Sequence, residues 1–420
     1  MKRFLLFSLV VGCALIGHAQ FVVTGTGRAV LLSGNSIVGL QTLCLINGIT
    51  ADNQLVFNGH ANTYLWTTFD GAFVSNQPSI AVDDETGYVL NADGQKYYVW
   101  VIDYHKYPVQ LYAIAPAADH ADACSQLSLQ VSANVPSLLY RDSLGVAHSL
   151  PRLFTLTYND ESFSNNAWNN ITHTQVVNDL TQPIVIPAPY CNTQFTISGD
   201  QYAASFGMAT LSVTSSPYTA VCVEAHLTGT INERSATNEA GRQIGPLEGS
   251  APLDVDFQSN ANVPVTQFYE WFVYNDQVPG SYYRYTDQNL HYLFSQAGTY
   301  KVVLTVSNAS NSCSYSDSLM VKVSDSFIDV PNVFTPNGDG INDVFCVSFR
   351  SIVQFHMVVY SSWAGKVFET DDPGHGWDGR SGGKLEPPGV YYYLINATGA
   401  DGKKYKLKGS VTLLRDKGDH

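Results

Sequence analysis

Charged residues are scarce in this chain of 420 residues, at 14% of the sequence, and so are residues that favour helices. There are 4 Met and only 22 Lys and Arg, whereas Thr, Ser, Asn, Val and Tyr are abundant. β-branched and aromatic residues favour strands, while Met, Lys and Arg favour helices. The composition therefore predicts an all-β protein.

Basic patches are also missing from most of the sequence. The formal net charge is −14, and residues 327–420 hold 10 Lys and Arg against 11 Asp and Glu, so the negative charge lies almost entirely before residue 327. A nucleic-acid-binding protein needs clustered Lys and Arg to displace phosphate counterions. We therefore expect no nucleic-acid partner.

The sequence contains no His-Glu-x-x-His zinc motif, no phosphate-binding Gly-rich loop ending in Lys, and no Cys-x-x-Cys pair. Paired carboxylates need no fixed spacing, but the acidic cluster Asp83-Asp-Glu85 is better interpreted as a hydrated turn. Asp119, His120, Asp122 and Cys124 lie in or beside a predicted linker, where metal ligands would not be preorganised. We expect a protein that is not an enzyme.

The N-terminus has the pattern of a secretory signal peptide. Lys2 and Arg3 precede an apolar run that is followed by small residues, which predicts a signal peptide over residues 1–19 and cleavage between Ala19 and Gln20. A lipobox-like sequence leaves acylation of Cys13 as an alternative. No other run reaches the roughly 20 apolar residues of a membrane-spanning helix, so we expect no transmembrane segment in the mature chain.

Six cysteines follow the signal peptide, and an exported protein meets an oxidising compartment in which some should pair. They are Cys44, Cys124, Cys191, Cys222, Cys313 and Cys346. The sequence does not choose among the connectivities. A bridge within the second predicted domain, such as Cys191 with Cys222, is weakly preferred.

The segment before residue 230 divides into two predicted β-sandwiches. Short alternating runs separated by turns indicate an immunoglobulin-like sandwich over residues 20–116. Residues 117–123 lack bulky apolar side chains and predict a linker. A second β-sandwich is expected over 124–229, with the Asn- and Ser-rich stretch 158–171 as an exposed loop.

Residues 240–324 contain three blocks in a familiar order: Gly249-Ser-Ala-Pro-Leu-Asp-Val-Asp-Phe257, Tyr269-Glu-Trp-Phe272, and Tyr292 to Asn308 with its Ala-Gly-Thr-Tyr step. These blocks resemble a PKD domain, which implies a β-sandwich with Trp271 in its core. The chain departs from the family after the tryptophan strand, where Val273-Tyr-Asn275 replaces the usual Gly-Asp step.

Tyr282, Tyr283 and Tyr285 surround Arg284 beyond a Pro-Gly turn in this third unit. They are candidates for an exposed aromatic platform that binds a sugar or a protein partner. Packing against a neighbouring domain is the alternative, because aromatic side chains usually bury most of their area.

The final unit, residues 327–420, contains five blocks in order. They begin at Val330, Trp363, Gly376, Pro388 and Lys408, and the first reads Val330-Pro-Asn-Val-Phe-Thr-Pro-Asn-Gly-Asp-Gly-Ile-Asn-Asp-Val-Phe345. The unit resembles the gliding-motility-associated C-terminal domain, the type B sorting domain of the type IX secretion system. Ser361-Ser362 stands where the family usually has Asn-Arg.

The resemblance implies a β-sandwich that addresses the chain to the type IX secretion machinery and hence to the outer cell surface or the medium. It also implies that the domain can be removed afterwards, most plausibly in the polar stretch Ser324-Asp-Ser326. The residues matched to the sorting motif are Pro331, Asn332, Phe334, Thr335, Pro336, Asn337, Gly338, Asp339, Gly340, Asn342, Asp343, Trp377, Asp378 and Gly379.

One part of this motif has a second interpretation. Asn337, Asp339 and Asp343 follow a spacing similar to Asp-rich calcium loops, with Gly340 allowing a sharp turn. Thr335 stands where such loops carry an acid, so the charge available for Ca²⁺ is low. A tight turn whose side chains bond their own backbone is the stronger interpretation, and a weak calcium site is the alternative.

Together these features predict tandem immunoglobulin-like and PKD-like β-sandwiches with a C-terminal sorting domain. We expect a secreted or cell-surface protein with an adhesive, binding or structural role. The alternative is a glycan-binding or glycan-degrading accessory protein, with its active surface within residues 20–230.

Overall fold

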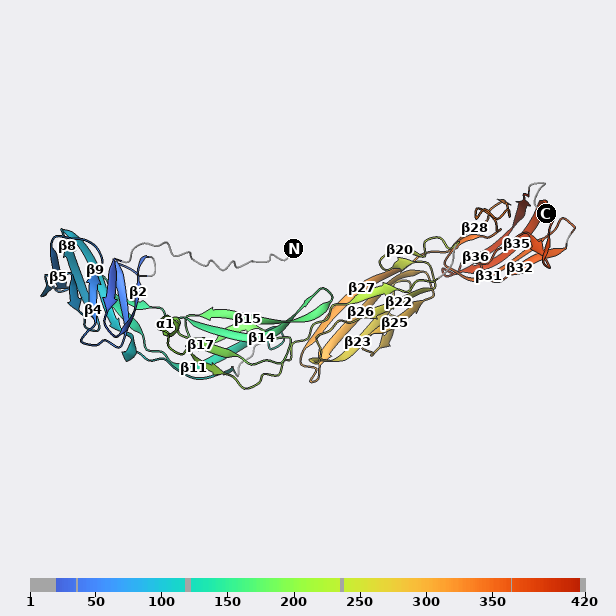
Figure 1. The fold of residues 1–420 in the computed structure, drawn as a ribbon. Coiled ribbons are helices and arrows are strands. Elements are labelled where there is room, and N and C mark those ends of the chain that lie inside the picture. The colour runs from blue at the N-terminus through green and yellow to red at the C-terminus, as the bar shows by residue number, and fades with distance from the viewer. Residues whose placement is uncertain (1–19, 35–36, 118–121, 235–237, 364, 416–420) are drawn as a thin grey trace.

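The computed structural model describes residues 20–34, 37–117, 122–234, 238–363 and 365–415. The predicted signal peptide, including Ala19 and Cys13, lies outside the described residues. The chain forms an elongated row of four β-sandwich units, with the first and the last at opposite ends (Figure 1). Strands supply nearly all of the regular structure, which confirms the predicted all-β class. Among the described residues, no helix combines the length and apolar character needed to cross a membrane.

The first unit packs the sheet β1-β4-β7 against the six-stranded sheet β2-β3-β9-β8-β5-β6. Phe21, Trp66 and Leu90 lie buried between the two sheets, and Cys44 is a buried free thiol in the same core. The elements are β1 Phe21–Thr24, β2 Arg28–Leu32, β3 Thr42–Asn47, β4 Gln54–Phe57, β5 Tyr64–Thr68, β6 Phe73–Ser75, β7 Ser79–Ala81, β8 Thr86–Ala92, β9 Gln95–Asp103 and the short 3₁₀ helix η2 Tyr104–Lys106.

The second unit combines the sheets β10-β11-β16 and β15-β14-β17-β18 with the hairpin β12-β13. Leu129, Leu156 and Phe195 lie in its core. The elements are β10 Gln110–Pro116, β11 Gln126–Asn134, β12 Leu138–Arg141, β13 Ala147–Leu150, β14 Phe154–Ser164, β15 Ala167–Val177, β16 Ile184–Pro187, β17 Thr196–Gly199, α1 Gln201–Ser205 and β18 Leu211–Thr214.

Three sequence-based expectations differ from this arrangement. β10 and β11 pair antiparallel, so the predicted linker 117–123 joins two strands of one sheet instead of two domains. The predicted loop 158–171 belongs to the paired strands β14 and β15, because Phe154, Leu156 and Tyr158 alternate into the core. Residues 228–229, expected in the second domain, belong to β19, which pairs with β22 in the third unit.

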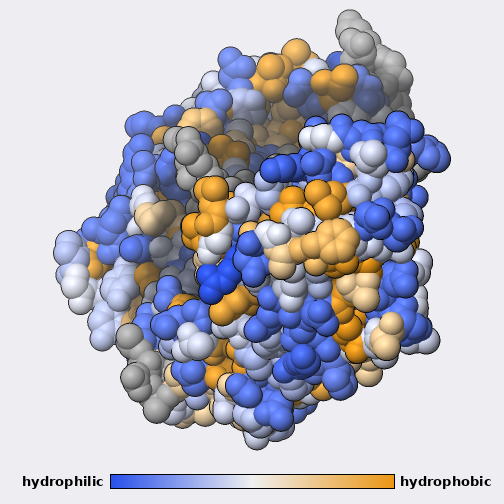
Figure 2. All heavy atoms as spheres, turned by 90° about the vertical axis from the view of Figure 1, so that its left-hand side faces the viewer, coloured by the Kyte–Doolittle hydropathy of each residue, from blue (hydrophilic) through white to orange (hydrophobic). Residues whose placement is uncertain are grey.

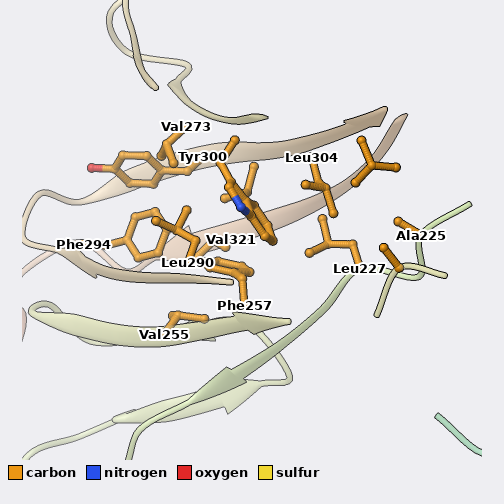
Figure 3. Close-up of a cluster of buried hydrophobic side chains, with 14 of the residues drawn as sticks. Ala225, Leu227, Val255, Phe257, Val273, Leu290, Phe294, Tyr300, Leu304 and Val321 are labelled. Atoms are coloured by element: carbon orange, nitrogen blue, oxygen red, sulfur yellow. The ribbon is translucent and has the colours of Figure 1, made fainter. Parts of the chain in front are cut away.

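The third unit packs the sheet β19-β22-β25 against β20-β21-β27-β26-β23-β24. In Figure 3, Phe257 and Leu290 of one sheet point toward Val273 and Leu304 of the other. Trp271 is fully buried there, as the PKD resemblance implies. The strands are β19 Thr228–Ile231, β20 Gln243–Gly245, β21 Glu248–Gly249, β22 Leu253–Gln258, β23 Thr266–Asn275, β24 Tyr282–Tyr285, β25 Leu290–Phe294, β26 Gly298–Asn308 and β27 Ser314–Val323.

The fourth unit is built on the sheet β29-β36-β35-β31-β32, with the two-stranded sheets β28-β30 and β33-β34 beside it. Its core gathers Phe334, Phe345, Met357 and Trp377. The strands are β28 Phe327–Asp329, β29 Val333–Phe334, β30 Ser348–Arg350, β31 Ile352–Tyr360, β32 Lys366–Thr370, β33 Arg380–Ser381, β34 Lys384–Leu385, β35 Gly389–Gly399 and β36 Lys404–Leu413.

Candidate functional site

The exposed loop after β29 is organised around one carboxylate. Asp343 Oδ1 accepts hydrogen bonds from the backbone N–H groups of Asn337 (2.9 Å) and Gly338 (2.7 Å), and Oδ2 accepts one from Gly340 (2.7 Å). Hydrogen bonds from the backbone of Gly338 and Gly340 favour the charged form and lower the pKa of Asp343 from its ordinary value. The loop is therefore folded around an ionised side chain.

The other two calcium candidates are also engaged within the loop. Asp339 Oδ1 accepts from Ile341 N (2.7 Å), and Asp339 Oδ2 accepts from Asn337 Nδ2 (3.0 Å). Asn337 Oδ1 accepts from the backbone of Asp339 (3.1 Å). In the part of the chain that the structure describes, no three His, Cys, Asp or Glu side chains gather as metal ligands. The contacts are those of the self-bonded turn, and the calcium site stays a prediction.

Trp377 holds the motif block that begins at Gly376 in the core of the same unit. The indole is fully buried and its Nε1 donates to Arg380 O (2.7 Å). The backbone of Trp377 exchanges two hydrogen bonds with Phe345, of 2.8 and 2.9 Å, and its ring lies 5.3 Å from that of Phe334. The block beginning at Gly376 is thereby fixed against the block beginning at Val330.

The end of the chain closes this cluster. β29 pairs in parallel with the end of β36, where Thr412 N donates to Asn332 O (2.9 Å) and Leu414 N donates to Phe334 O (3.0 Å). Gly379 has a φ of +77°, and a Cβ there would meet Arg415 Nη2 at 2.9 Å. The positive φ favours glycine at this position, and any other side chain would require Arg415 to move. The sorting-motif residues therefore share one folded unit, with the loop 337–340 exposed at its surface.

The attachment of this unit to the third one involves residues that no sequence motif marks. Asn238 Nδ2 donates to Val347 O (2.6 Å) and Pro373 O (2.7 Å). Ser351 N donates to Ser250 Oγ (2.7 Å), and Ala240 N donates to Phe349 O (2.7 Å). These contacts join residues far apart in sequence, so no local pattern reveals them.

The stretch proposed for cleavage lies inside this attachment. Ser324 and Ser326 are 8% and 9% exposed. Ser351 Oγ donates to Ser324 O (2.6 Å), and Ser326 donates through Oγ (2.7 Å) and through N (3.0 Å) to the carboxylate of Asp401. A protease would have to open these contacts before it could reach the stretch.

The three candidate tyrosines of β24 do not form one platform. Tyr282 lies on the outer face of the sheet, where its ring is 5.4 Å from Phe272 and 5.6 Å from Tyr274. Tyr283 and Tyr285 contact Tyr292 of β25, at 6.4 and 6.0 Å. Tyr282 and Tyr283 are exposed, whereas Tyr285 packs partly on the core.

Two sequence features with a superficial resemblance to active sites have structural roles. Gly379-Arg-Ser-Gly-Gly383 has the spacing of a serine nucleophile motif, but it forms the hairpin β33-β34 and not a strand-to-helix turn. In the acidic cluster, Asp84 accepts from Asp103 N (2.6 Å) and pairs with Lys106 (3.0 Å).

Comparisons with known proteins assign parts of the chain. A fibronectin type III domain model matches residues 116–215, and the CHU_C type IX secretion signal domain model matches residues 328–413. A search of curated proteins finds no match to this chain.

Among solved structures, the chain is similar to a tetra-tandem repeat in the extending region of a large adhesion protein, with 12% identity, 89% of this chain and 98% of that chain covered, and a TM-score of 0.22. It is also similar to a Ca²⁺-stabilized adhesin of an Antarctic bacterium that binds ice, with 12% identity, 89% and 98% covered, and a TM-score of 0.20. For immunoglobulin domains 1–5 of Sidekick-1 the identity is 14%, the coverage 93% and 77%, and the TM-score 0.26. These scores support no argument about function.

The geometry of the last unit and its family match lead to one assignment. Residues 328–413 are a type IX secretion signal domain, placed after three further β-sandwich units.

Proposed function

We propose that this protein is exported by the type IX secretion system and acts at the cell surface as a rigid, non-enzymatic spacer that presents its first unit to a binding partner. Export to the surface or the medium follows from the signal domain. The observation that supports the spacer role is that each of the three junctions between units is built from side-chain contacts.

The first junction is a shared core with a buried ion pair. Leu43 and Trp100 of the first unit pack in one cluster with Leu138 and Phe206 of the second. Arg152 Nε donates to Asp200 Oδ2 (2.5 Å), and Tyr104 of the first unit donates to Asp200 Oδ1 (2.7 Å). Burial, followed by the hydrogen bond to Asp200, raises the pKa of Tyr104 to about 12.

The second junction combines a disulfide with an aromatic contact. Cys124 is bonded to Cys313 of the third unit, and Cys191 and Cys222, the weakly preferred pair, are free thiols. The tip of the hairpin β14-β15 reaches the third unit (Figure 1), where the ring of Phe163 stacks on that of His226 at 3.9 Å. The third junction is the attachment of the fourth unit through Asn238 and Ser351, described above. At every junction, therefore, side-chain contacts add to the covalent connection.

The exposed end of the first unit is the surface that such a spacer would present. Figure 2 looks onto this end of the molecule, where hydrophobic residues are scattered among hydrophilic ones. Phe73, at 68% exposed, belongs to the edge strand β6 of this unit. Non-obligate protein interfaces are about as apolar as the rest of a protein surface, so this mixed surface is compatible with such an interface.

Two measurements test the proposal. Deletion of residues 327–420 should leave the protein inside the cell, and secretion without this segment would contradict type IX export. Small-angle X-ray scattering of the mature protein should give one extended form, and Trp168→Ala with Cys124→Ser should broaden the distribution of lengths. Broad flexibility in the unmodified protein would contradict the spacer.

A glycan-binding role is the second candidate, favoured by the cluster of Phe272, Tyr274 and Tyr282 beside the Arg284–Glu270 pair. Exposed aromatic faces next to hydrogen-bonding groups suit a sugar ring. A glycan array with the mature protein and with Tyr274→Ala/Tyr282→Ala tests it, and equal signals from both would exclude this cluster.

A further inference from the structure

The outer face of β35 and β36 in the signal domain carries an apolar strip beside a row of lysines. Strand alternation sends Tyr391, Ile395 and Val411 into the core and leaves their neighbours outside. Val390, Tyr392 and Leu394 of β35 are 47%, 52% and 47% exposed. Lys404, Lys406 and Lys408 of β36 lie on the same face, since Lys408 is opposite Leu394 and Lys406 opposite Asn396.

Among the residues that the structure describes, these three lysines have no anionic partner. Within the described ranges none of them forms a salt bridge or a side-chain hydrogen bond, whereas Lys106, Lys322 and Lys366 each pair with a carboxylate. The residues opposite them on β35 are neutral. The face therefore presents free positive charge, in a protein whose net charge is −14.

A shallow hollow of about 640 Å³ lies at one end of the strip, lined by residues that include Tyr360, Ser361, Tyr392 and Lys408. Trp363 follows the lining residues Ser361 and Ser362 in the turn after β31 and is 92% exposed. Exposed tryptophan and tyrosine beside lysine is the residue combination found where proteins contact the interface of a membrane.

Lysines on an edge strand have a plainer role, because they prevent pairing with another sheet. β29 pairs only with Thr412 and Leu413, so residues 404–408 do form an edge. That role does not account for the exposed apolar residues of β35, which is an interior strand of the sheet. A combined basic and apolar surface needs an occupant that is both anionic and apolar.

We propose that this face binds the anionic surface of a lipid bilayer. The lysines would lie against phosphate-bearing headgroups, with Tyr392, Leu394 and Trp363 at the boundary of the acyl region. The negative charge of the headgroups would repel the acidic units that precede the signal domain. The row of sandwiches would therefore point away from the membrane. The signal domain would then hold the protein on a membrane surface after export.

The test uses the purified full-length mature protein and two kinds of vesicle, pure phosphatidylcholine and phosphatidylcholine with about a third phosphatidylglycerol. We expect sedimentation with the anionic vesicles alone, and a blue shift of tryptophan emission that Trp363→Phe removes. Raising the salt from about 0.1 M to about 1 M should abolish binding. Lys404→Gln/Lys406→Gln/Lys408→Gln should weaken partitioning about 100-fold.

The matched control is a second triple variant that loses the same net charge at positions outside this face. Lys96→Gln/Lys301→Gln/Lys384→Gln removes three exposed lysines outside the face and should bind as the unmodified protein does. Equal losses in the two triple variants, equal binding to both vesicles, or no binding at all would each overturn the proposal. Normal secretion of the face variant supports it, whereas retention of that variant inside the cell would show that the face docks onto the secretion machinery instead.

Discussion

Cys124 and Cys313 join the second and third units by a disulfide between residues 189 positions apart. The bond restricts the unfolded chain, and disulfides of this kind contribute about 2–4 kcal/mol. We predict that Cys124→Ser/Cys313→Ser separates the unfolding of these two units into distinct transitions in calorimetry, the lower one shifted down. Cys346→Ser, which removes a free thiol in the last unit, is the control. An unchanged single transition in the double variant would contradict a coupling role.

Arg152 and Asp200 form a buried ion pair, with side chains 4% and 0% exposed. We predict that Arg152→Ala lowers the free energy of unfolding by about 3–5 kcal/mol, because the carboxylate is left buried and unpaired. Arg284→Ala is the matched control, since its pair with Glu270 is exposed and worth about 0.2–1 kcal/mol. Chemical denaturation of both variants measures the difference, and similar losses would refute the buried pair as a major contribution.

The loop around Asp343 should respond to acid. Its pKa is lowered in the folded protein, so ionisation stabilises the loop above the ordinary value of 3.8, and this contribution is lost as the pH falls through the folded pKa. We predict that Asp343→Asn speeds hydrogen exchange of the Gly338 and Gly340 amides at neutral pH. The difference from the unmodified protein should vanish at acid pH. Asp329→Asn is the control, because Asp329 is an exposed residue of β28. In this variant the amides of the two glycines should exchange as in the unmodified protein at every pH.

Calcium removal tests the alternative interpretation of the same loop. Because the carboxylates of Asp339 and Asp343 already accept hydrogen bonds within the loop, we predict that a chelator leaves the Tm of the last unit unchanged. Any calcium effect should require millimolar concentrations, as in weak extracellular sites. A fall in Tm with chelator that calcium reverses would establish a structural ion.

The stretch 324–326, in which Ser324 and Ser326 are buried, should resist proteolysis until its contacts are weakened. The carboxylate of Asp401 accepts hydrogen bonds from the backbone N–H and from the hydroxyl of Ser326. We predict that Asp401→Ala accelerates limited proteolysis between the third and fourth units several-fold, as mapped by mass spectrometry. Asp371→Ala removes an acid whose side chain is 85% exposed and should leave the rate unchanged. Rapid cleavage of the unmodified protein at this stretch would show that the contacts do not protect it.

The sequence predicted those parts of the structure that depend on local pattern. The resemblance of its motif block places Trp271 in the core, and Trp271 is fully buried. Alternation along β23 places Glu270 on the opposite face from Trp271, and Glu270 pairs there with Arg284.

The prediction that rested on composition alone, the loop over residues 158–171, was wrong. The Asn- and Ser-rich stretch 158–171 suggested a loop, yet Phe163 and Trp168 within it make the contact with the third unit. Asn238 donates to the backbone carbonyls of Val347 and Pro373, which any residue could supply. No side-chain pattern in the sequence therefore marks this contact.

The pairing of β29 with the last residues of β36 also means that this part of the signal domain can fold only after those residues have been synthesised. The first motif block of the signal domain finds its neighbouring strand only when residues 412–413 are present. A chain interrupted anywhere before them would lack the closing strand, whatever the state of its other units. The signal domain therefore cannot form this strand pair until residue 413 has been synthesised.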